Sequence, residues 1–427
     1  MNLFDGAISI TGVTFLAFMG FEIIFFGYLL GRIRIKGIGL GTAGVFIVAL
    51  LFGALYSTEI GQNITQTVAG EKVDISLNSL KVIDTTGLVI FVGSIGLISG
   101  PGFFKSLKSN FRDYFLVAVV ITVVGVLATV LCFYLGRGEH RSAQECIAAL
   151  SGVMSGALTS AAALSAAKDV LATVAADQGS VLSVADAEAI ASVGYGIAYV
   201  FGVIGVVLFV QVIPTITGAN MEKERALISF KKTDEDVAAK KWFEVDPQGL
   251  CALAFVLVLG ILIGTFRIPL TPKGYSGATF SLTSTGGVLL TGLVVGHFGH
   301  IGPIGVNLSS NTLRSFRELG LVLFLVGSGV AGGMKFAEYF KLAYFFYGII
   351  ITMAPMLASY LFAKYVLKTP LLNNLGSIAG GMTSTPALAA LIDSAKTEDV
   401  TPAYAATYPI ALTGTIVGAQ FLVLLLS

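Results

Sequence analysis

Two short motifs place glycines next to hydroxyl side chains inside otherwise apolar sequence. The first, at residues 154–164, reads MSGALTSAAAL, and the second, at residues 380–388, reads GGMTSTPAL. A helix broken at such a point offers free backbone N–H groups and the partial positive charge of a helix N-terminus. Hydroxyl groups add hydrogen-bond donors and acceptors. Two matched breaks deep in apolar sequence are typical of the polar site in a secondary transporter.

The predicted substrate ligands are the glycines, hydroxyl residues and proline of these two motifs. They are Gly156, Thr159, Ser160, Gly380, Gly381, Thr383, Ser384, Thr385 and Pro386. The alternative is that Ser and Thr serve only as small packing residues between membrane helices. We favour the site because the motif occurs twice. The first copy reads SAAAL where the second reads STPAL, so the two half-sites are expected to differ.

Few charged residues lie inside the apolar segments. Glu22 could take up a coupling proton, or it could pair with a basic residue in a helix interface. Arg317 could lie near an anionic substrate, or it could extend to the membrane surface. Asp84 and Glu318 are expected at helix starts, where carboxylates stabilise the helix dipole. Neither motif contains Asp or Glu, which favours an anion or a zwitterion over a cation as substrate.

Several functional classes lack their signatures. The net charge is only +1, which gives no indication of nucleic-acid binding. There is no Walker motif and no nucleophile with His and acid partners, so we expect no enzyme and no cofactor. The three cysteines lie in apolar sequence and suggest no disulfide. His297 and His300 could face a metal together, but without further ligands they are expected at a loop edge.

The composition is that of a multi-pass membrane protein. Of 427 residues, 55% are hydrophobic and 12% are charged, and the mean hydropathy is +0.87. About 20 apolar residues cross a bilayer. The apolar segments are 11–31, 37–56, 85–100, 113–136, 144–167, 188–213, 248–266, 278–297, 318–334, 342–363, 371–392 and 403–426. No basic region precedes the first segment, which predicts a retained helix rather than a cleaved signal peptide.

The two halves of the chain repeat each other. Gly87, Phe91, Gly96 and Gly100 recur 233 positions later as Gly320, Phe324, Gly329 and Gly333. The offset shrinks further along, where Thr159-Ser160 pairs with Thr383-Ser384. We expect a first membrane repeat at 1–216, a cytoplasmic linker at 217–247 with a surface helix around Trp242, and a second repeat at 248–427.

The predicted fold is all-α and polytopic. The repeats are inverted if each has about five crossings plus one broken or re-entrant helix at the Thr-Ser motif. The basic loops 32–36 and 105–112 are placed in the cytoplasm, so both termini are expected outside. The first two segments of each half are expected to form a rigid scaffold. Gly37, Gly41 and Gly44 form a small-residue stripe that suggests a homodimer.

Five stretches resemble the aspartate:alanine exchanger family of bacterial secondary transporters. They are KGIGLGTAGVFIVALLFG (36–53), GLVIFVGSIGLISGPGFF (87–104), RELGLVLFLVGSGVAGG (317–333), GGMTSTPAL and TYPIALTGTIVG. The resemblance implies a multi-pass protein of the bacterial inner membrane that exchanges amino acids or C4-dicarboxylates. Many members carry central cytoplasmic domains of the RCK type, and here only the linker 217–247 stands in that place.

The resulting hypothesis is an antiporter for small carboxylates such as aspartate, alanine or succinate, with alternating access of the elevator kind. A sodium- or proton-coupled symporter of glutamate-like anions is one alternative. A channel-like or regulatory membrane protein is another. The expected partners are the carboxylate substrate, the lipid bilayer and a second copy of the chain.

Overall fold

The structure is a computed structural model of the 427-residue chain. It describes residues 2–3, 8–35, 38–39, 41–68, 71–106, 111–140, 142–176, 181–228, 249–266, 268–269, 279–280, 283–301, 304–305, 310–397 and 399–427. The predicted surface helix around Trp242 lies outside these residues, and so does Gly37.

Helices form most of the described first half, since an apolar run in a membrane must satisfy its backbone groups internally. Their bounds are α1 Gly12–Gly31, α2 Ala43–Leu55, α3 Ser57–Asn63, α4 Ser76–Ser106, α5 Phe111–Gly136, α6 Ala143–Ala157, α7 Ala161–Ala176, α8 Val184–Ile216 and α9 Met221–Ile228. A short 3₁₀ turn, Arg137–Glu139, follows α5.

The second half repeats this order. Its helices are α10 Leu250–Gly264, α11 Thr283–Phe298, α12 Ser310–Met334, α13 Phe336–Tyr339, α14 Ala343–Phe362, α15 Leu371–Gly381, α16 Thr385–Ala395 and α17 Thr401–Leu426. A π-helical turn, Ala363–Leu367, ends α14.

The described strands are short and pair as antiparallel two-stranded hairpins in the connections. They are β1 Asn2–Leu3 with β2 Ile8–Ser9, β3 Arg34–Ile35 with β4 Ile38–Gly39, β5 Thr65–Val68 with β6 Glu71–Asp74, β7 Ile268–Pro269 with β8 Thr279–Phe280, and β9 His300–Ile301 with β10 Ile304–Gly305. In the longest hairpin Thr65 lies opposite Asp74.

Seven of the described helices are long and apolar enough to cross a bilayer, namely α1, α4, α5, α8, α12, α14 and α17. Three shorter helices, α2, α10 and α11, are also apolar. Together these helices divide equally, five in each half. The two remaining helix pairs, α6 with α7 and α15 with α16, contain the two Thr-Ser motifs. The expectation of an all-α polytopic protein with five crossings and one broken element per repeat is confirmed.

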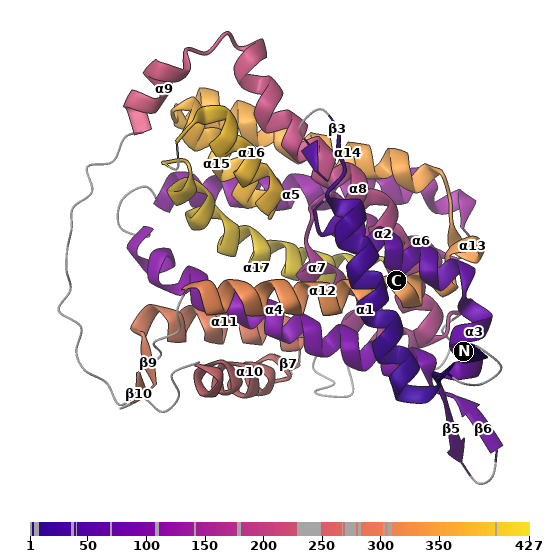
Figure 1. The fold of residues 1–427 in the computed structure, drawn as a ribbon. Helices are drawn as coiled ribbons and strands as arrows, with labels where there is room; N and C mark the ends of the chain where they lie inside the picture. The colour runs from indigo at the N-terminus through magenta and orange to yellow at the C-terminus, as the bar shows by residue number, and fades with distance from the viewer. Residues whose placement is uncertain are drawn as a thin grey trace.

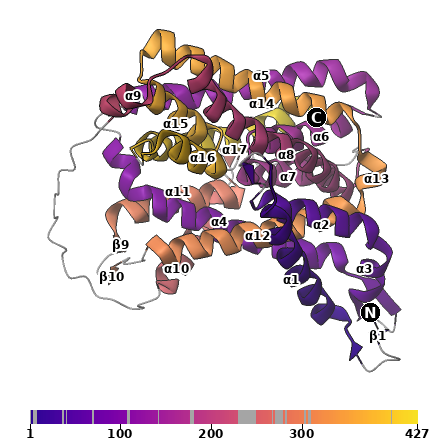
Figure 2. The same cartoon turned by 45° about the horizontal axis from the view of Figure 1, so that its top comes forward.

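The helices form two packed bodies (Figures 1 and 2). The scaffold body consists of α1, α2, α4, α10, α11 and α12, with α4 packed between α11 and α12. The core body consists of α5, α6, α7, α8, α14, α15, α16 and α17. The scaffold thus takes the first three crossing helices of each half, one more than the sequence suggested, because α4 and α12 pack most closely on each other and on α11 and α2.

Glycines allow the scaffold helices to touch backbone to backbone. A Cβ on Gly44 of α2 would lie 2.4 Å from the Gly27 carbonyl oxygen of α1. A Cβ on Gly96 of α4 would lie 2.8 Å from the Gly292 Cα of α11. Gly44 is therefore used for packing within the chain, which removes it as an argument for a homodimer.

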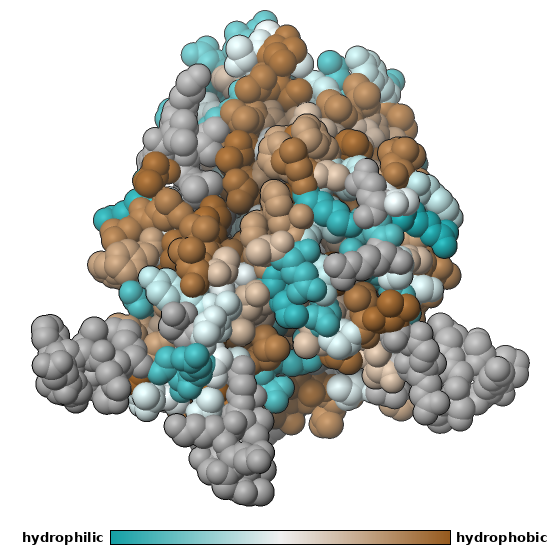
Figure 3. Space-filling view, turned by 90° about the vertical axis from the view of Figure 1, so that its right-hand side faces the viewer, coloured by the Kyte–Doolittle hydropathy of each residue, from teal (hydrophilic) through white to brown (hydrophobic). Residues whose placement is uncertain are grey.

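The molecule has two distinct ends. The start of α1, the β5–β6 hairpin and the end of α17 lie at one end, called here the terminal end (Figure 1, right). The end of α8, α9 and the start of α10 lie at the other, called here the linker end (Figure 1, left). Figure 3 looks onto the terminal end, where hydrophilic residues form patches among hydrophobic ones. The predicted orientation places the linker end in the cytoplasm.

Candidate substrate site at the tips of two re-entrant hairpins

The first motif ends α6 with a left-handed residue. Thr159 has φ of 52°, and its N–H donates to the Gly156 carbonyl at 3.0 Å. The Ser160 N–H donates to the Ser155 carbonyl at 2.8 Å. This pair of bonds is the Schellman arrangement that closes a helix, and glycine usually fills its left-handed position. The chain turns there and α7 begins at Ala161.

The second motif has the same geometry. Thr383 has φ of 51°, and its backbone N–H donates to the Gly380 carbonyl at 3.0 Å. The Ser384 N–H donates to the Ala379 carbonyl at 3.0 Å. A β-branched residue at positive φ is a conformational outlier. Such strain persists only where surrounding contacts impose it, and it clusters at functional sites. Its presence at both motifs marks them as one specialised structure used twice.

The α6/α7 pair is a hairpin that enters and leaves at the terminal end. The Lys168 ammonium of α7 lies 3.1 Å from the Asp84 carboxylate, near the start of α4. Glu188, at the start of α8, pairs with Lys81 of α4. Because α4 begins at the terminal end, α7 must return there rather than cross.

The α15/α16 pair enters and leaves at the linker end. The Leu371 N–H at the start of α15 donates to Glu224 of α9 at 3.0 Å. The Arg225 guanidinium of α9 donates to the Ala395 carbonyl at the end of α16 at 3.2 Å. Both ends of this hairpin therefore lie beside α9. The two hairpins approach the centre from opposite ends, as inverted repeats require.

The hairpin tips hold each other through their threonines. The Thr159 hydroxyl donates to the Met382 carbonyl at 2.7 Å, and the Thr383 hydroxyl donates to the Leu158 carbonyl at 2.9 Å. Each bond satisfies a carbonyl left free where the partner helix ends. The two predicted motifs are thus brought together, and their threonine hydroxyls bind the opposite tip.

The serines start the second helix of each hairpin. The Ser160 hydroxyl accepts from the Ala163 N–H at 3.2 Å and lies 3.3 Å from the Thr415 hydroxyl of α17. The Ser384 hydroxyl accepts from the Ala387 N–H at 3.4 Å. A helix N-terminus attracts anions, and here two of them, those of α7 and α16, lie at the centre of the protein.

A polar cavity of about 340 Å³ lies beside the tips, on the linker-end side. It is bounded by both hairpins, by α8 and α17 of the core, and by α2, α4 and α12 of the scaffold. The lining residues are Gly41, Thr42, Phe91, Thr159, Ser160, Ala161, Tyr195, Tyr199, Val203, Arg317, Glu318, Leu321, Thr383, Ser384, Thr385, Pro386, Tyr408 and Leu412. Six of the nine predicted ligands are among them.

The three predicted glycines lie behind the tips. A Cβ on Gly156 would lie 2.4 Å from the Tyr195 carbonyl oxygen, and one on Gly380 would lie 2.5 Å from that of Tyr404. A Cβ on Gly381 would lie 2.2 Å from the Ile121 side chain. These glycines let the hairpins pack closely against α8, α17 and α5, and none of them lines the cavity.

The cavity contains both signs of charge. Among the residues that the structure describes, none forms a hydrogen bond or ion pair with the Arg317 guanidinium. Glu318 accepts a hydrogen bond from the Tyr28 hydroxyl at 2.8 Å. Glu22 lies within α1 and does not line the cavity, and the described chain offers it no ion-pair partner.

The helix-start interpretation of Asp84 and Glu318 is wrong. The helix α4 begins at Ser76 and α12 begins at Ser310, each about two turns before the carboxylate. The helices are longer than their apolar segments because polar first turns continue the same backbone hydrogen bonding beyond the hydrophobic run.

Sequence reasoning missed the tyrosines of the cavity. Tyr195 and Tyr199 of α8 stack at 4.9 Å between ring centroids, and Tyr408 of α17 lies among the lining residues. When the two halves of the sequence are aligned, Tyr195 in GYGIAYVFGVIG falls opposite Tyr408 in TYPIALTGTIVG. This pairing could have indicated the cavity, because a buried tyrosine needs a hydrogen-bond partner for its hydroxyl group and here the need recurs in both halves.

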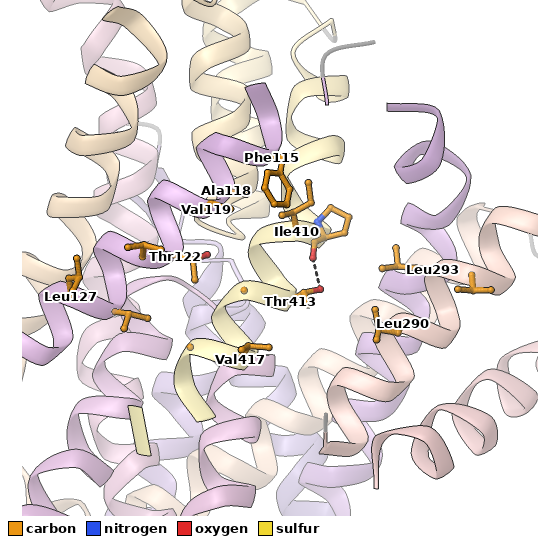
Figure 4. A pocket seen from close by; sticks show the side chains of 16 residues that line it. Phe115, Ala118, Val119, Thr122, Leu127, Leu290, Leu293, Ile410, Thr413 and Val417 are labelled. Atoms are coloured by element: carbon orange, nitrogen blue, oxygen red, sulfur yellow. Dashed lines mark hydrogen bonds between the residues drawn. The ribbon is translucent and has the colours of Figure 1, made fainter. Parts of the chain in front are cut away.

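A larger hollow of about 670 Å³ is unsuited to a charged substrate (Figure 4). It lies between α11 of the scaffold and α5 and α17 of the core. Its walls are aliphatic and aromatic apart from two threonines. The Thr413 hydroxyl is already donated to the Pro409 carbonyl of its own helix at 2.9 Å, and the Thr122 hydroxyl is itself buried. No charged side chain lines the hollow, so burial of a charge there would be costly. Within the described ranges, no group of three or more His, Cys, Asp or Glu residues could hold a metal.

Two hairpins in inverted repeats, with a polar cavity between two membrane bodies, form the architecture of a transporter. The family described as predicted permease membrane region, Asp-Al_Ex, matches residues 19–215 and 252–424. The chain belongs to this family. The two matched segments leave out residues 216–251, which contain the linker.

Several similar proteins carry transporter names. A Bacteroides fragilis protein named uncharacterized transporter BF2680 is 25% identical, with 92% of this chain and 95% of the relative covered. An uncharacterized transporter of Bacteroides thetaiotaomicron is 26% identical with the same coverage. An uncharacterized transporter of Desulfotalea psychrophila, DP0976, is 24% identical, with 93% and 94% covered. The chain is therefore a multi-pass membrane transporter.

The relatives also carry residues that this chain lacks. The Bacteroides fragilis alignment runs over 546 positions, at least 119 more than the 427 residues here. In this chain 36 residues separate the two matched segments.

Proposed function

We propose that this chain is a secondary active antiporter that exchanges small amino acids or C4-dicarboxylates of the aspartate, alanine or succinate class across the bacterial inner membrane. Transport would follow alternating access of the elevator kind, with the core body moving against the scaffold. The observation that carries the proposal is the Arg317 guanidinium, which lines a polar cavity beside two helix N-termini.

Arg317 suits a carboxylate. A guanidinium binds carboxylates through two parallel hydrogen bonds, and it stays charged at all relevant pH values. Charged residues at membrane depth are costly and mark substrate pathways. The N-termini of α7 and α16 add partial positive charge, and Ser384 and Thr385 also line the cavity.

The presence of Glu318 in the cavity favours amino acids over dicarboxylates as the substrate. Its carboxylate and the Arg317 guanidinium line the same cavity without forming an ion pair. One cation and one anion in the lining of one cavity match a zwitterion, which carries a carboxylate and an ammonium group. Glu22, away from the cavity, would then be a candidate for coupling rather than for substrate contact.

Reconstitution into liposomes tests the proposal. Vesicles loaded with unlabelled aspartate, alanine or succinate should take up the labelled compound by counterflow without any ion gradient. Strict dependence on a sodium or proton gradient would support the symporter of glutamate-like anions instead. Unitary conductance in a planar bilayer would support a channel. Absence of counterflow for every small carboxylate would refute the proposed substrate class.

A further inference from the structure

A cluster of buried polar side chains lies near the terminal end, and none of them lines the substrate cavity. The Lys168 ammonium of α7 lies 3.1 Å from Asp84 Oδ2 of α4 and 3.1 Å from Ser328 Oγ of α12. Ser192 Oγ of α8 lies 3.3 Å from Ser328 Oγ. The Lys168 and Asp84 side chains are only 8% and 13% exposed. Four helices therefore meet at one ion pair.

The cluster joins the two bodies. Lys168 and Ser192 belong to the core, whereas Asp84 and Ser328 belong to the scaffold. Two further ion pairs, both more exposed to solvent, also join core and scaffold at this end: Lys81 with Glu188 and Lys335 with Asp186. The hydrogen bond that the Lys335 ammonium donates to the Asp186 carboxylate raises the pKa of Lys335, which keeps that lysine charged. Core and scaffold are thus tied together at the terminal end.

The internal repeat shows what stands at the equivalent place near the linker end. The offset of 233 maps Asp84 onto Arg317, and the hairpin offset of 224, from Thr159 to Thr383, maps Lys168 onto Ile392. An isoleucine cannot form the ion pair, and Arg317 lines the open cavity. The two halves therefore differ: one is closed by an ion pair and the other is open.

The ion pair is poorly suited to a purely stabilising role. Asp84 Oδ1 has no hydrogen-bond partner within the described ranges. Attraction between buried charges offsets their desolvation only when the remaining hydrogen bonds are made. Removal of one partner is nevertheless strongly destabilising, because it leaves an unpaired buried charge. Such a pair adds little to the free energy of unfolding, but it favours the arrangement of helices in which the two charges meet.

We propose that the Lys168–Asp84 pair is a latch that closes the transport pathway at the terminal end and holds the protein in the state whose cavity lies toward the linker end. The inference rests on the proposed alternating access, and it does not depend on which carboxylate is carried. Lys168 is a positioning residue: it acts on the relative placement of core and scaffold and touches no substrate. Opening of the terminal end requires this pair to separate.

The proposal can be tested by the reactivity of a cysteine placed at a buried position of α7, between the latch and the hairpin tip. Ala162, fully buried in α7, corresponds to Pro386, which lines the open cavity. An Ala162→Cys reporter in a Cys251→Ser background should react slowly with a membrane-impermeant thiol reagent applied at the terminal end. Lys168→Met should raise the labelling rate at least tenfold, about 1.4 kcal/mol in the equilibrium between states. The exchanged pair Lys168→Asp with Asp84→Lys should restore protection.

Lys81→Met is the matched control. Lys81 also links α4 to the core, but it is half exposed, and exposed pairs contribute little. Its labelling rate should stay near that of the parent. Equal labelling of the Lys168→Met, Lys81→Met and parent proteins would overturn the latch. Labelling that rises with Lys168→Met while no carboxylate is transported would leave the latch standing and refute the substrate class.

A disulfide test covers the case in which Lys168→Met fails to fold. Cysteines at Ser192 and Ser328 should form a disulfide between core and scaffold and block exchange until reductant is added. Cysteines at Ala198 and Gly348 lie on α8 and α14, within the core, and should leave exchange intact when oxidised. Full exchange by the oxidised Ser192–Ser328 protein would show that this contact does not open, which would contradict the proposal.

Discussion

At the scale of single residues, the unusual feature is a threonine in left-handed conformation at each hairpin tip. Glycine would adopt this conformation without strain, but it has no hydroxyl to donate across the tips. Thr159 and Thr383 make reciprocal bonds to the opposite hairpin. The strain of two β-branched residues is therefore kept in exchange for a hydrogen-bonded junction between the repeats.

The junction predicts different effects for two conservative changes of Thr383. Thr383→Ser keeps the hydroxyl and should behave like the parent. Thr383→Val keeps the shape but leaves the buried Leu158 carbonyl unpaired, which costs about 1–3 kcal/mol. Thermal unfolding in detergent should show the loss, and counterflow should slow. Ser155→Ala is the control, because that hydroxyl bonds only within its own helix. Equal stability of the Val and Ser variants would show that the hydroxyl does not hold the tips together.

Arg317 carries the prediction on substrate affinity. Arg317→Gln should raise the KM for a carboxylate by about 10- to 100-fold, since a hydrogen bond to a charged group contributes about 1.5–3 kcal/mol. The concentration dependence of counterflow measures this change. Arg314→Gln, one turn earlier on α12 and exposed, should leave the KM unchanged. An unaltered KM in Arg317→Gln would remove the guanidinium from the proposed site.

At the scale of elements, the two hairpins decide the topology. A straight broken helix would give each half an even number of crossings and parallel repeats. Re-entrant hairpins leave five crossings in each half, so the repeats are inverted. The contacts of Lys168 with α4 and of Arg225 with the end of α16 fix the direction of each hairpin.

Cysteine mapping should reproduce this topology. In a Cys251→Ser background, whose other cysteines are buried, Arg137→Cys and Ala176→Cys flank the first hairpin and should both react only from outside. Tyr365→Cys and Lys396→Cys flank the second hairpin and should both react only from the cytoplasm, as should cysteines in the linker 217–247. Labelling of residues 137 and 176 from opposite sides would mean that the first motif crosses the membrane.

At the scale of the whole molecule, the two bodies make different kinds of contact at their boundary. Ion pairs tie them at the terminal end, a polar cavity separates them toward the linker end, and an apolar hollow lies between α11 and α17 (Figure 4). Apolar surfaces have no directional bonds to break during sliding. This boundary is therefore suited to relative movement of core and scaffold.

A moving core needs a fixed partner surface, so we expect the scaffold bodies of two chains to form a homodimer. Mass measurement in mild detergent and in lipid should give twice the mass of the chain. Exposed apolar side chains of α10, such as Phe255, Val258 and Leu262, are the candidates for that surface. Replacing them with alanine should weaken the dimer, whereas alanine in place of Val123 on α5 of the core should not. A stable monomer in lipid would contradict this arrangement.

The sequence by itself determined the membrane class, the internal repeat, the position of the two breaks and the family. Each of these depends on composition, spacing or local backbone preference, all of which are present in the linear chain. Glycines beside Thr159 and Thr383 were correctly located, but their role was not, because close approach of α8 and α17 is a property of packing. The helix starts predicted at Asp84 and Glu318 were placed too late, because the polar first turns of α4 and α12 are not apolar and hydropathy does not reveal them.

Only the tertiary structure decided which residues from distant segments meet. The hydroxyl of Thr159 finds the carbonyl of Met382, and Lys168 finds Asp84, across separations of 223 and 84 residues. No local rule predicts such pairs, because they arise from the way the two repeats pack around one another. The same packing leaves Arg317 in an open cavity while its repeat equivalent, Asp84, is buried in an ion pair. A duplicated sequence can thus fold into two halves in different states, because the contacts between repeats, rather than the repeats themselves, set which end is closed.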